Sequence, residues 1–440
     1  MKIVQAVGWY FPDSLGGTEV YVRALCHRLQ AAGHEVVVAA PDPGAPAERR
    51  YEDRGVRVYR YPIAKDVTRA EARGEVAVRG AERFHRWLMD ERAGVVHFHT
   101  FVTGVSLPEL RAARHSGART IVTTHSSSLG FLCMRGTLMH WGEEPCDGVV
   151  EPSKCVACAL HGRGMPKPVA RVFGAVPLSF ARAVRNAPTP LATALALPDV
   201  VRANLARQRE ALSIADRFVV LTEAAQAILR ANAFDAANVC VNRLGIAQTV
   251  TRKSSPRERP TVRPVRIGYL GRFESIKGAD VLARAIALTR RDVPLRVEFR
   301  GPVNTAADRA AIERIRALTS GDARVSIAPA VPPEHVADLL ADLDVLCCPA
   351  VCHEGGPTVA LEALAVGTPV IGSRIGGLAE MIRDDVNGRL VPAGDASSLA
   401  SVLTDVALSP DTTIDQWRAS TTNVRTMDDV AADYLTFYNA

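Results

Sequence analysis

Two acidic residues flank the start of a predicted helix near the end of the chain. Glu354 lies in a short loop rich in glycine and proline, and Glu362 follows eight residues later within the helix. Loop amides and the positive end of a helix attract phosphate, while a loop carboxylate can bind hydroxyls. Residues 352–389 therefore predict a ligand site at the carboxyl edge of a parallel sheet. A plainer interpretation stays open, in which one glutamate stabilises the helix dipole and the other lies on the surface.

Two basic residues occupy the segment GRFESIKG, residues 271–278, directly after a predicted strand. Breaking a bond between a sugar and a phosphate builds negative charge on the leaving group, and fixed cations there lower the barrier. Arg272 and Lys277 are placed to neutralise a diphosphate leaving group in this way. The alternative is that both are solvated charges in a loop.

Four of the nine cysteines fall in one segment that lacks clear periodicity: Cys133, Cys146, Cys155 and Cys158. The last two form a C-x-x-C pair. In a cytoplasmic protein this spacing favours a tetrahedral zinc site over disulfides, and the metal would order the segment. Reduced free cysteines and an iron–sulfur cluster remain open alternatives.

Strands and helices alternate through two long parts of the chain, which predicts α/β domains with parallel sheets. The first domain is expected at residues 1–250, with a cysteine-bearing, proline-cut insertion at about 126–213 and a helix near residues 75–91. A proline-rich, basic linker is expected at 251–264. A second domain at 265–412 and a helical tail at 413–440, packed back on the first domain, complete the expected organisation.

The composition is that of a globular protein that stays out of the bilayer interior. Hydrophobic residues make up 48% and charged residues 23% of the chain, and no apolar run is long enough to span a membrane. The start lacks a signal-peptide pattern, so we expect a cytoplasmic protein. The basic stretch 167–209 has two interpretations, an amphipathic face on the inner surface of the membrane or helices packed on the domain. Aromatic and basic residues do not interleave, and we expect no nucleic-acid partner.

Five segments together resemble the retaining glycosyltransferases of family 4, and in particular a subset with a cysteine-rich insertion in the N-terminal domain. The segments are GGTEVYVRALCHRLQAAGHEV, VVHFHTF, TTHSS, GYLGRFESIKG and EGGPTVALEALAVGTPVIGSRIGGLAEMI…NGRLV. The resemblance implies the GT-B fold, with two doubly wound Rossmann-like domains facing a central cleft. One position differs: Gly356 stands where similar enzymes usually have a bulky apolar residue.

The resemblance also implies roles for individual residues. Glu354, His125, Lys277 and Arg272 would act at the reacting sugar and the diphosphate, and Glu362 would bind the nucleotide ribose. The residues implied to bind the nucleotide sugar are Gly16, Gly17, Arg272, Lys277, Glu354, Gly355, Gly356, Pro357, Thr358, Val359 and Glu362. In such enzymes the leaving phosphate is favoured as the base, so neither a catalytic metal nor a carboxylate pair of the glycosidase kind is implied.

The expected function is therefore transfer of a sugar, with retention, from a nucleotide-diphosphate sugar to a glycan or lipid-linked acceptor in cell-surface polysaccharide or glycoconjugate synthesis. A structural zinc ion is the expected cofactor. Two other functions stay open: a nucleotide-sugar epimerase on the same fold, and a non-catalytic binding protein. The intact set of charged residues disfavours the binding protein, and the cationic loop disfavours the epimerase.

Overall fold

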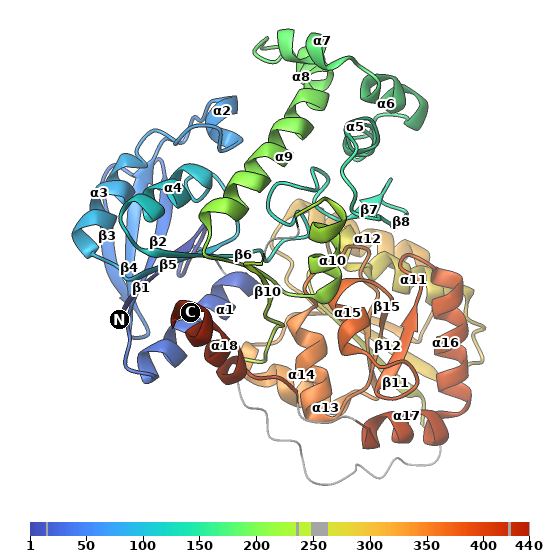
Figure 1. Cartoon of the computed structure of the whole chain (residues 1–440). Helices are drawn as coiled ribbons and strands as arrows, with labels where there is room; N and C mark the ends of the chain where they lie inside the picture. The colour runs from blue at the N-terminus through green and yellow to red at the C-terminus, as the bar shows by residue number, and fades with distance from the viewer. Residues whose placement is uncertain (15, 235–236, 248–262, 421–423, 440) are drawn as a thin grey trace. The chain divides into compact units, whose positions relative to one another are not determined.

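The computed structural model describes residues 1–14, 16–234, 237–247, 263–420 and 424–439. The chain forms two compact units, whose elements are labelled in Figure 1. Unit 1 comprises Met1–Gly136, Asp147–Ala247 and Thr426–Ala440, and unit 2 comprises Thr137–Cys146 and Gln248–Arg425. Most of the predicted linker, residues 251–262, lies outside the described residues.

Unit 1 is built on an eight-stranded sheet in the order β10-β9-β6-β5-β1-β2-β4-β3. All neighbouring strands are parallel except β3, which pairs antiparallel with β4 at the edge. The strands are β1 (Lys2–Val7), β2 (Glu35–Pro43), β3 (Arg49–Asp53), β4 (Val56–Ile63), β5 (Val95–His99), β6 (Arg119–Thr123), β9 (Arg217–Val220) and β10 (Val239–Val241). The central strands β1, β5 and β6 are almost wholly buried, as expected of a parallel sheet covered on both faces.

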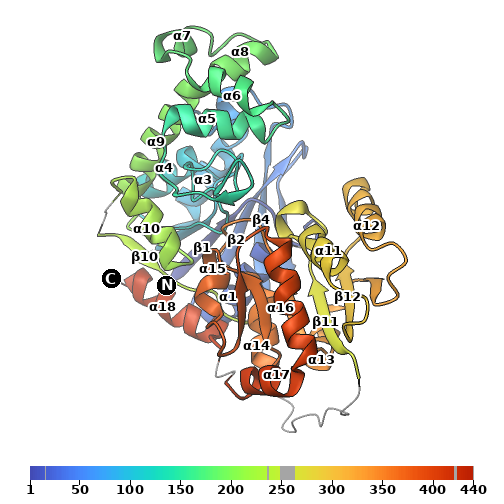
Figure 2. The ribbon, with the colours of Figure 1, turned by 90° about the vertical axis from the view of Figure 1, so that its right-hand side faces the viewer.

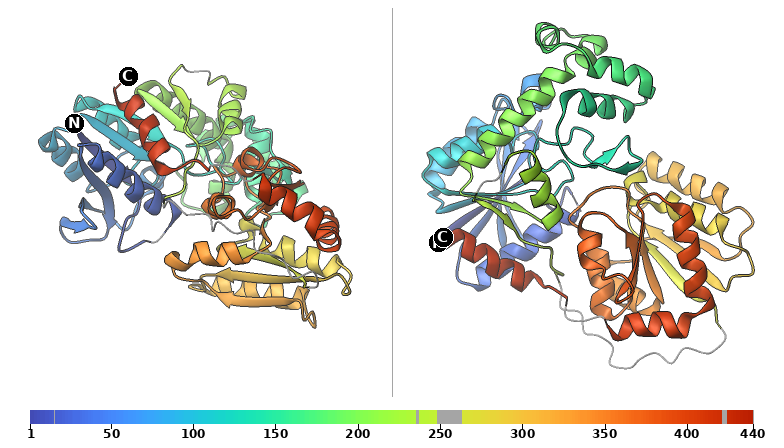
Figure 3. Two further views of the ribbon diagram at one scale, coloured as in Figure 1. Left: turned by 90° about the horizontal axis from the view of Figure 1, so that it is seen from below. Right: turned by 45° about the vertical axis from the view of Figure 1, so that its right-hand side comes forward.

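The helices of unit 1 include one from the end of the chain. They are α1 (Gly17–Ala31), α2 (Arg69–Ala72), α3 (Glu82–Glu91), α4 (Leu107–His115), α5 (Pro152–His161), α6 (Lys167–Gly174), α7 (Leu178–Ala183), α8 (Pro190–Leu195), α9 (Leu197–Ile214), α10 (Glu223–Ala231) and α18 (Met427–Asn439). Helix α18 packs against α1, as Figure 3 shows. Prolines in the first turns of α5, α6, α8 and α9 start separate helices in the insertion, and α5, α7 and α8 pack on the long helix α9.

One predicted helix is shorter than expected. A helix near residues 75–91 was predicted, but α3 begins only at Glu82. Gly80 interrupts it with φ of +100°, and a Cβ there would lie 2.4 Å from the carbonyl oxygen of Pro62. The close approach of the chain to β4 therefore requires a non-helical glycine, which periodicity alone does not reveal.

Unit 2 is built on a six-stranded, fully parallel sheet in the order β13-β12-β11-β14-β15-β16. Its strands are β11 (Val265–Leu270), β12 (Leu295–Gly301), β13 (Val325–Pro329), β14 (Val345–Cys348), β15 (Val370–Ser373) and β16 (Gly388–Val391). Its helices are η1 (Ser275–Lys277), α11 (Ala279–Leu288), α12 (Ala306–Leu318), η2 (Pro333–His335), α13 (Val336–Asp342), α14 (Thr358–Val366), α15 (Gly376–Met381), α16 (Ala396–Leu408) and α17 (Pro410–Ala419). The two-residue strands β7 (Met139–His140) and β8 (Glu144–Pro145) form a small hairpin in the same unit.

The two faces of the second sheet hold separate apolar clusters. Val345 and Cys347 pack with α11, α12, α16 and α17, whereas Leu346 and Cys348 pack with α13, α14 and α15. This alternation is the period of two of a strand buried on both sides. Helices α11 and α16 lie side by side on one face (Figure 2). The predicted α/β class with two parallel sheets is confirmed, and none of the described helices is both long and apolar enough to cross a bilayer.

Candidate functional site

The strand order of unit 2 reverses between β11 and β14, and this is where the predicted donor residues meet. From β11 the chain winds outward through β12 and β13 on one side, and then returns to β14 and winds outward through β15 and β16 on the other. The loops that leave two such adjacent strands diverge and open a crevice at the carboxyl edge of the sheet. Lys277 follows β11 and Glu354 follows β14, so both lie at this switch point.

Lys277 and Glu354 form an ion pair with 2.5 Å between Nζ and Oε2. Both side chains are largely buried, being 22% and 16% exposed. The second carboxylate oxygen of Glu354, Oε1, is buried and has no hydrogen-bond partner among the described residues. A buried carboxylate oxygen without a donor is costly, and a ligand hydroxyl would satisfy it.

Backbone contacts hold the two loops together. The amide of Val351 donates to the carbonyl oxygen of Ile276 at 2.8 Å. Gly278 has φ of +77°, and a Cβ at this position would lie 1.8 Å from the carbonyl oxygen of Pro349. The phenol of Tyr269 donates to the carbonyl oxygen of Arg272 at 2.6 Å. The position of Lys277 is thus fixed by main-chain packing on both sides.

The glycine pair at 376 and 377 supports the Glu354 loop from behind. The amide of Gly377 donates to the carbonyl oxygen of Glu354 at 2.8 Å. A Cβ on Gly377 would lie 2.1 Å from the carbonyl oxygen of Gly355. Gly356 has φ of +110°, and a Cβ there would lie 2.2 Å from Cε of Met381. The positive φ favours glycine at position 356, and a larger side chain there would also have to displace the end of the Met381 side chain.

Helix α14 begins at Thr358, directly after the loop, and Pro357 at its N-cap provides no side-chain cap. The first amides of this nine-residue helix, including those of Thr358 and Val359, are available to a ligand. Glu362 lies in the second turn, and burial raises the pKa of its carboxyl. It makes no hydrogen bond or ion pair with any residue that the structure describes.

Arg272 is positioned differently from Lys277. Its side chain is 61% exposed, and its guanidinium pairs with Glu274 of the same loop at 2.6 Å. The structure therefore brings Lys277 and Glu354 together, while Arg272 points to solvent on the same loop.

In unit 1, His125 follows β6 and lies at the end of a chain of buried polar groups. Its Nε2 is 3.0 Å from Nδ1 of His99, whose Nε2 is 2.6 Å from Oε1 of Gln5. The ring of Tyr21 packs edge-on against His125 with 4.8 Å between centroids. Burial lowers the pKa of His125 to about 4 and that of His99 well below its usual value, so both are neutral near pH 7.

These contacts determine which nitrogen of His125 bears the proton. The Gln5 oxygen can only accept, so the Nε2 of His99 donates to it and the Nδ1 of neutral His99 must accept. His125 therefore donates through Nε2 and keeps the lone pair on Nδ1, which can accept a hydroxyl proton from a ligand. His97 is held separately by Tyr438 and Thr123, at 2.7 and 2.8 Å.

The buried histidines predict a loss of stability in acid. The pKa of such a histidine is lower in the folded protein than in the unfolded chain, where it is about 6.5. At a pH between the two pKa values, the unfolded chain therefore binds more protons than the folded protein. We therefore expect the free energy of unfolding to fall as the pH drops from about 6.5 to about 4, by on the order of 2–3 kcal/mol from His125 alone. Urea unfolding at several pH values measures this change. The slope should shrink in His125→Gln and persist in His115→Gln, whose side chain is exposed; equal slopes in both variants would contradict the prediction.

Gly16 and Gly17, predicted to lie near the phosphates, are the N-cap and first residue of α1 in unit 1. A Cβ on Gly16 would lie 2.4 Å from Oε2 of Glu19, whereas a Cβ on Gly17 would have none of the described residues beyond its chain neighbours within 4 Å. Gly17 is therefore the position at which a ligand can approach the backbone.

The four cysteines predicted to bind zinc are divided between the units. Cys133, Cys155 and Cys158 belong to unit 1 and Cys146 to unit 2. Within the described parts of the chain, no group of three or more histidine, cysteine or acidic residues is arranged to hold a metal ion. Zinc at these cysteines stays a prediction.

Elemental analysis of the purified protein tests that prediction. We expect about one zinc per chain, lost in the double variant Cys155→Ser/Cys158→Ser and kept in Cys240→Ser. A stable, metal-free wild-type protein would remove the zinc site.

Sequence reasoning missed Gln5 and the supporting role of His99. The spacing of His97 and His99 on one strand was visible, but their partners come from β1, β6 and α18, which are distant in sequence. It also missed the pocket of unit 1 described below.

Comparisons with known proteins point to one class of enzyme. Residues 264–407 match the family model described as Glycosyl transferases group 1, and residues 15–180 match Glycosyltransferase Family 4. A D-inositol 3-phosphate glycosyltransferase from Arthrobacter sp. is 28% identical over 92% of this chain and 85% of its own length. The protein of that name from Streptomyces coelicolor is 36% identical over 33% of each chain, so that match spans about a third of the relative.

Two solved structures share the fold. Sucrose-phosphate synthase from Thermosynechococcus elongatus has a TM-score of 0.67 at 18% identity, covering 100% of this chain and 98% of its own. HepE from Anabaena, in complex with UDP and glucose, has a TM-score of 0.61 at 12% identity, covering 99% and 98%. The predicted GT-B fold is confirmed.

Proposed function

Because the chain is a glycosyltransferase with the GT-B fold, we propose that it transfers a sugar from a nucleotide-diphosphate sugar bound at the Lys277–Glu354 crevice of unit 2. The observation that supports this most directly is the buried Oε1 of Glu354, which has no hydrogen-bond partner among the described residues and lies beside a largely buried lysine. The carboxylate would accept a sugar hydroxyl, and the ammonium would stabilise charge on the departing diphosphate. Arg272 would add a second cation from the same loop, and Glu362 would bind the ribose.

We infer that the reaction retains the anomeric configuration. The bond between the anomeric carbon and the phosphate oxygen breaks, the acceptor oxygen bonds to that carbon on the same face, and the leaving phosphate takes the acceptor's proton. Such a reaction needs no second protein carboxylate and no metal. His125, through its Nδ1 lone pair, would orient a hydroxyl of the transferred sugar.

A panel of UDP-, GDP- and dTDP-sugars tests the proposal. We expect one donor to raise the melting temperature, since it binds only the folded state, and to be hydrolysed slowly to free sugar and nucleoside diphosphate. Conversion to an epimeric nucleotide sugar would instead favour the epimerase, and a thermal shift without turnover would favour the binding protein.

The acceptor is proposed to be a glycan or a lipid-linked glycan at the inner face of the cytoplasmic membrane. In the basic stretch, Val172 and Phe180 expose 70% and 50% of their surface on α6 and α7. Apolar side chains among basic ones suit the interface of an anionic bilayer.

Co-sedimentation with phosphatidylglycerol vesicles measures this contact. We expect binding to weaken several-fold in Val172→Ser/Phe180→Ser and to be unchanged in Leu288→Ser, which alters an equally exposed apolar residue of unit 2. Sedimentation that is the same in all three proteins would contradict membrane docking through α6 and α7.

A further inference from the structure

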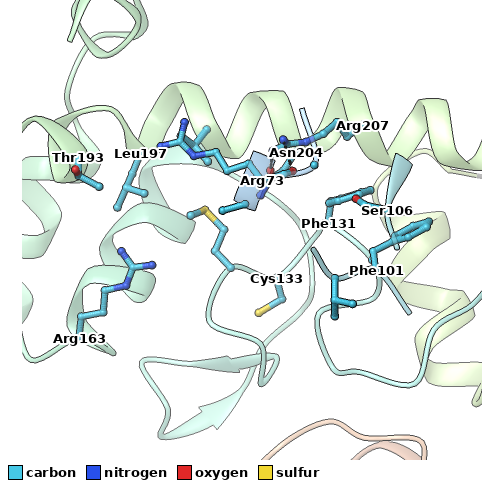
Figure 4. Close-up of a pocket in the computed structure, with 16 residues that line it drawn as sticks. Arg73, Phe101, Ser106, Phe131, Cys133, Arg163, Thr193, Leu197, Asn204 and Arg207 are labelled. Carbon is cyan, nitrogen blue, oxygen red and sulfur yellow. Dashed lines mark hydrogen bonds between the residues drawn. The ribbon is translucent and has the colours of Figure 1, made fainter. Parts of the chain in front are cut away.

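Unit 1 contains a pocket of about 350 Å³, whose lining includes Cys133 but none of the residues assigned to the donor site. The loops after β5 and β6 form one part of it, through Phe101 and Phe131, and helix α9 forms another. This volume lies within the range of small-molecule sites. Figure 4 shows Arg73 and Arg207 beside α9, with Arg163 across the drawn pocket from them.

Three arginines line the pocket, and none of its lining residues is acidic. Arg207 is the most buried of them, with its side chain 9% exposed. Its Nε is buried and has no hydrogen-bond partner among the described residues. Arg163 makes no side-chain hydrogen bond or ion pair within the described ranges, so its guanidinium is available to a ligand.

Two carboxylates, Glu75 and Asp199, lie near this cluster, and Asp199 is already paired with Arg185 and Arg182. One oxygen of Glu75 is shared by three guanidinium groups, those of Arg73 at 3.7 Å, Arg207 at 3.4 Å and Arg185. Burial lowers the pKa of Arg73 and of Arg207, and the Glu75 carboxylate opposes this shift. A bound dianion would supply balancing negative charge, since the forked N–H groups of guanidinium match phosphate oxygens.

Apolar side chains form a large part of the remaining wall, beside the polar Ser106, Thr193 and Asn204. Phe101 and Phe131 stack with 5.0 Å between centroids and 12° between planes, and Leu197 and Val200 line the pocket from α9. The guanidinium of Arg207 lies 5.4 Å from the Phe131 ring. A ligand that matches both sides carries phosphate at one end and an apolar ring face at the other.

We propose that this pocket binds a phosphate monoester on a polyhydroxylated ring, with the phosphate at Arg73, Arg163 and Arg207 and the C–H face of the ring against the aromatic pair. The identification of this ligand as the acceptor of the sugar rests on the proposed transferase function. The binding of the ligand does not depend on that function, because the pocket lies wholly in unit 1. The same chemistry occurs in a free sugar phosphate and in a phosphorylated lipid headgroup.

Calorimetric titration of the full chain with glucose 6-phosphate and with glucose tests the proposal. A second arm uses phosphatidylcholine vesicles with and without phosphatidylinositol 4-phosphate. We expect a phosphorylated probe in at least one arm to bind at least about tenfold more tightly than its neutral partner. The arm that binds identifies the free or the lipid-borne source. Equal binding of charged and neutral probes in both arms would overturn the proposal.

Matched variants locate the bound probe. Arg163→Gln and Arg207→Lys should each weaken the phosphorylated probe about tenfold or more, because each loses charge-assisted hydrogen bonds. Arg86→Gln, an exposed arginine of α3 outside the pocket, should not. Lys277→Ala should also leave it unchanged, which separates this pocket from the donor crevice. Full affinity in both pocket variants, or a loss in Arg86→Gln, would reject the site.

Two readouts separate this inference from the proposed function. Donor hydrolysis without binding of a phosphorylated probe would overturn the pocket assignment alone. Arginine-dependent binding without hydrolysis of any donor would support the pocket and count against the transferase proposal.

Discussion

Lys277→Ala is expected to lower the rate of donor hydrolysis by at least about a hundredfold, because a fixed charge beside a developing anion contributes several kcal/mol to transition-state stabilisation. The substitution also removes the ammonium that lies 2.5 Å from the Glu354 carboxylate. This carboxylate is then largely buried without its charge partner, which is unfavourable. Steady-state release of free sugar from the best donor measures the change.

Three further variants sharpen this result. Glu354→Ala should abolish hydrolysis as well, and the double variant should cost less than the product of the two single effects, since the residues act as a pair. Arg284→Ala removes an exposed cation from the neighbouring helix α11 and should hydrolyse donor at the wild-type rate. Hydrolysis that survives both Lys277→Ala and Glu354→Ala would place the donor site elsewhere.

Gly278→Ala is expected to destabilise the protein by about 4 kcal/mol or more, or to displace the loop that presents Lys277. The new Cβ would lie 1.8 Å from the carbonyl oxygen of Pro349, which is backbone and cannot rotate away, and φ at this residue is +77°. Urea unfolding gives the change in stability, and donor hydrolysis reports on displacement of the loop.

Gly321→Ala is the matched control. Gly321 also has a left-handed φ, +69°, but the nearest atom to its added Cβ is 3.9 Å away. It should therefore show only the conformational cost of about 1–2 kcal/mol and normal hydrolysis. A Gly278→Ala protein that is as stable and as active as Gly321→Ala would show that the two loops are not locked together.

The sequence was sufficient for the fold class because its signals are local. Alternating strands and helices, the buried runs of β1, β5 and β6, and the loop chemistry of residues 271–278 and 352–357 can all be read within short windows. Local signals failed where a distant backbone intervened. Gly80 interrupts a helix-like pattern because the chain passes the carbonyl oxygen of Pro62.

The sequence by itself determined that one unit carries a cationic loop and a glutamate loop, both ahead of helices, and that a histidine follows a strand of the other unit. Only the tertiary structure decided which groups meet. The reversal of strand order between β11 and β14 places Lys277 against Glu354, whose Oε1 has no partner within the described part of the chain. The parallel pairing of β1, β5 and β6 joins Gln5, His99 and His125 into one polar chain, and the fold gathers three arginines from separate segments. Contacts of this kind depend on strand order and burial, which are properties of the whole chain and not of any window within it.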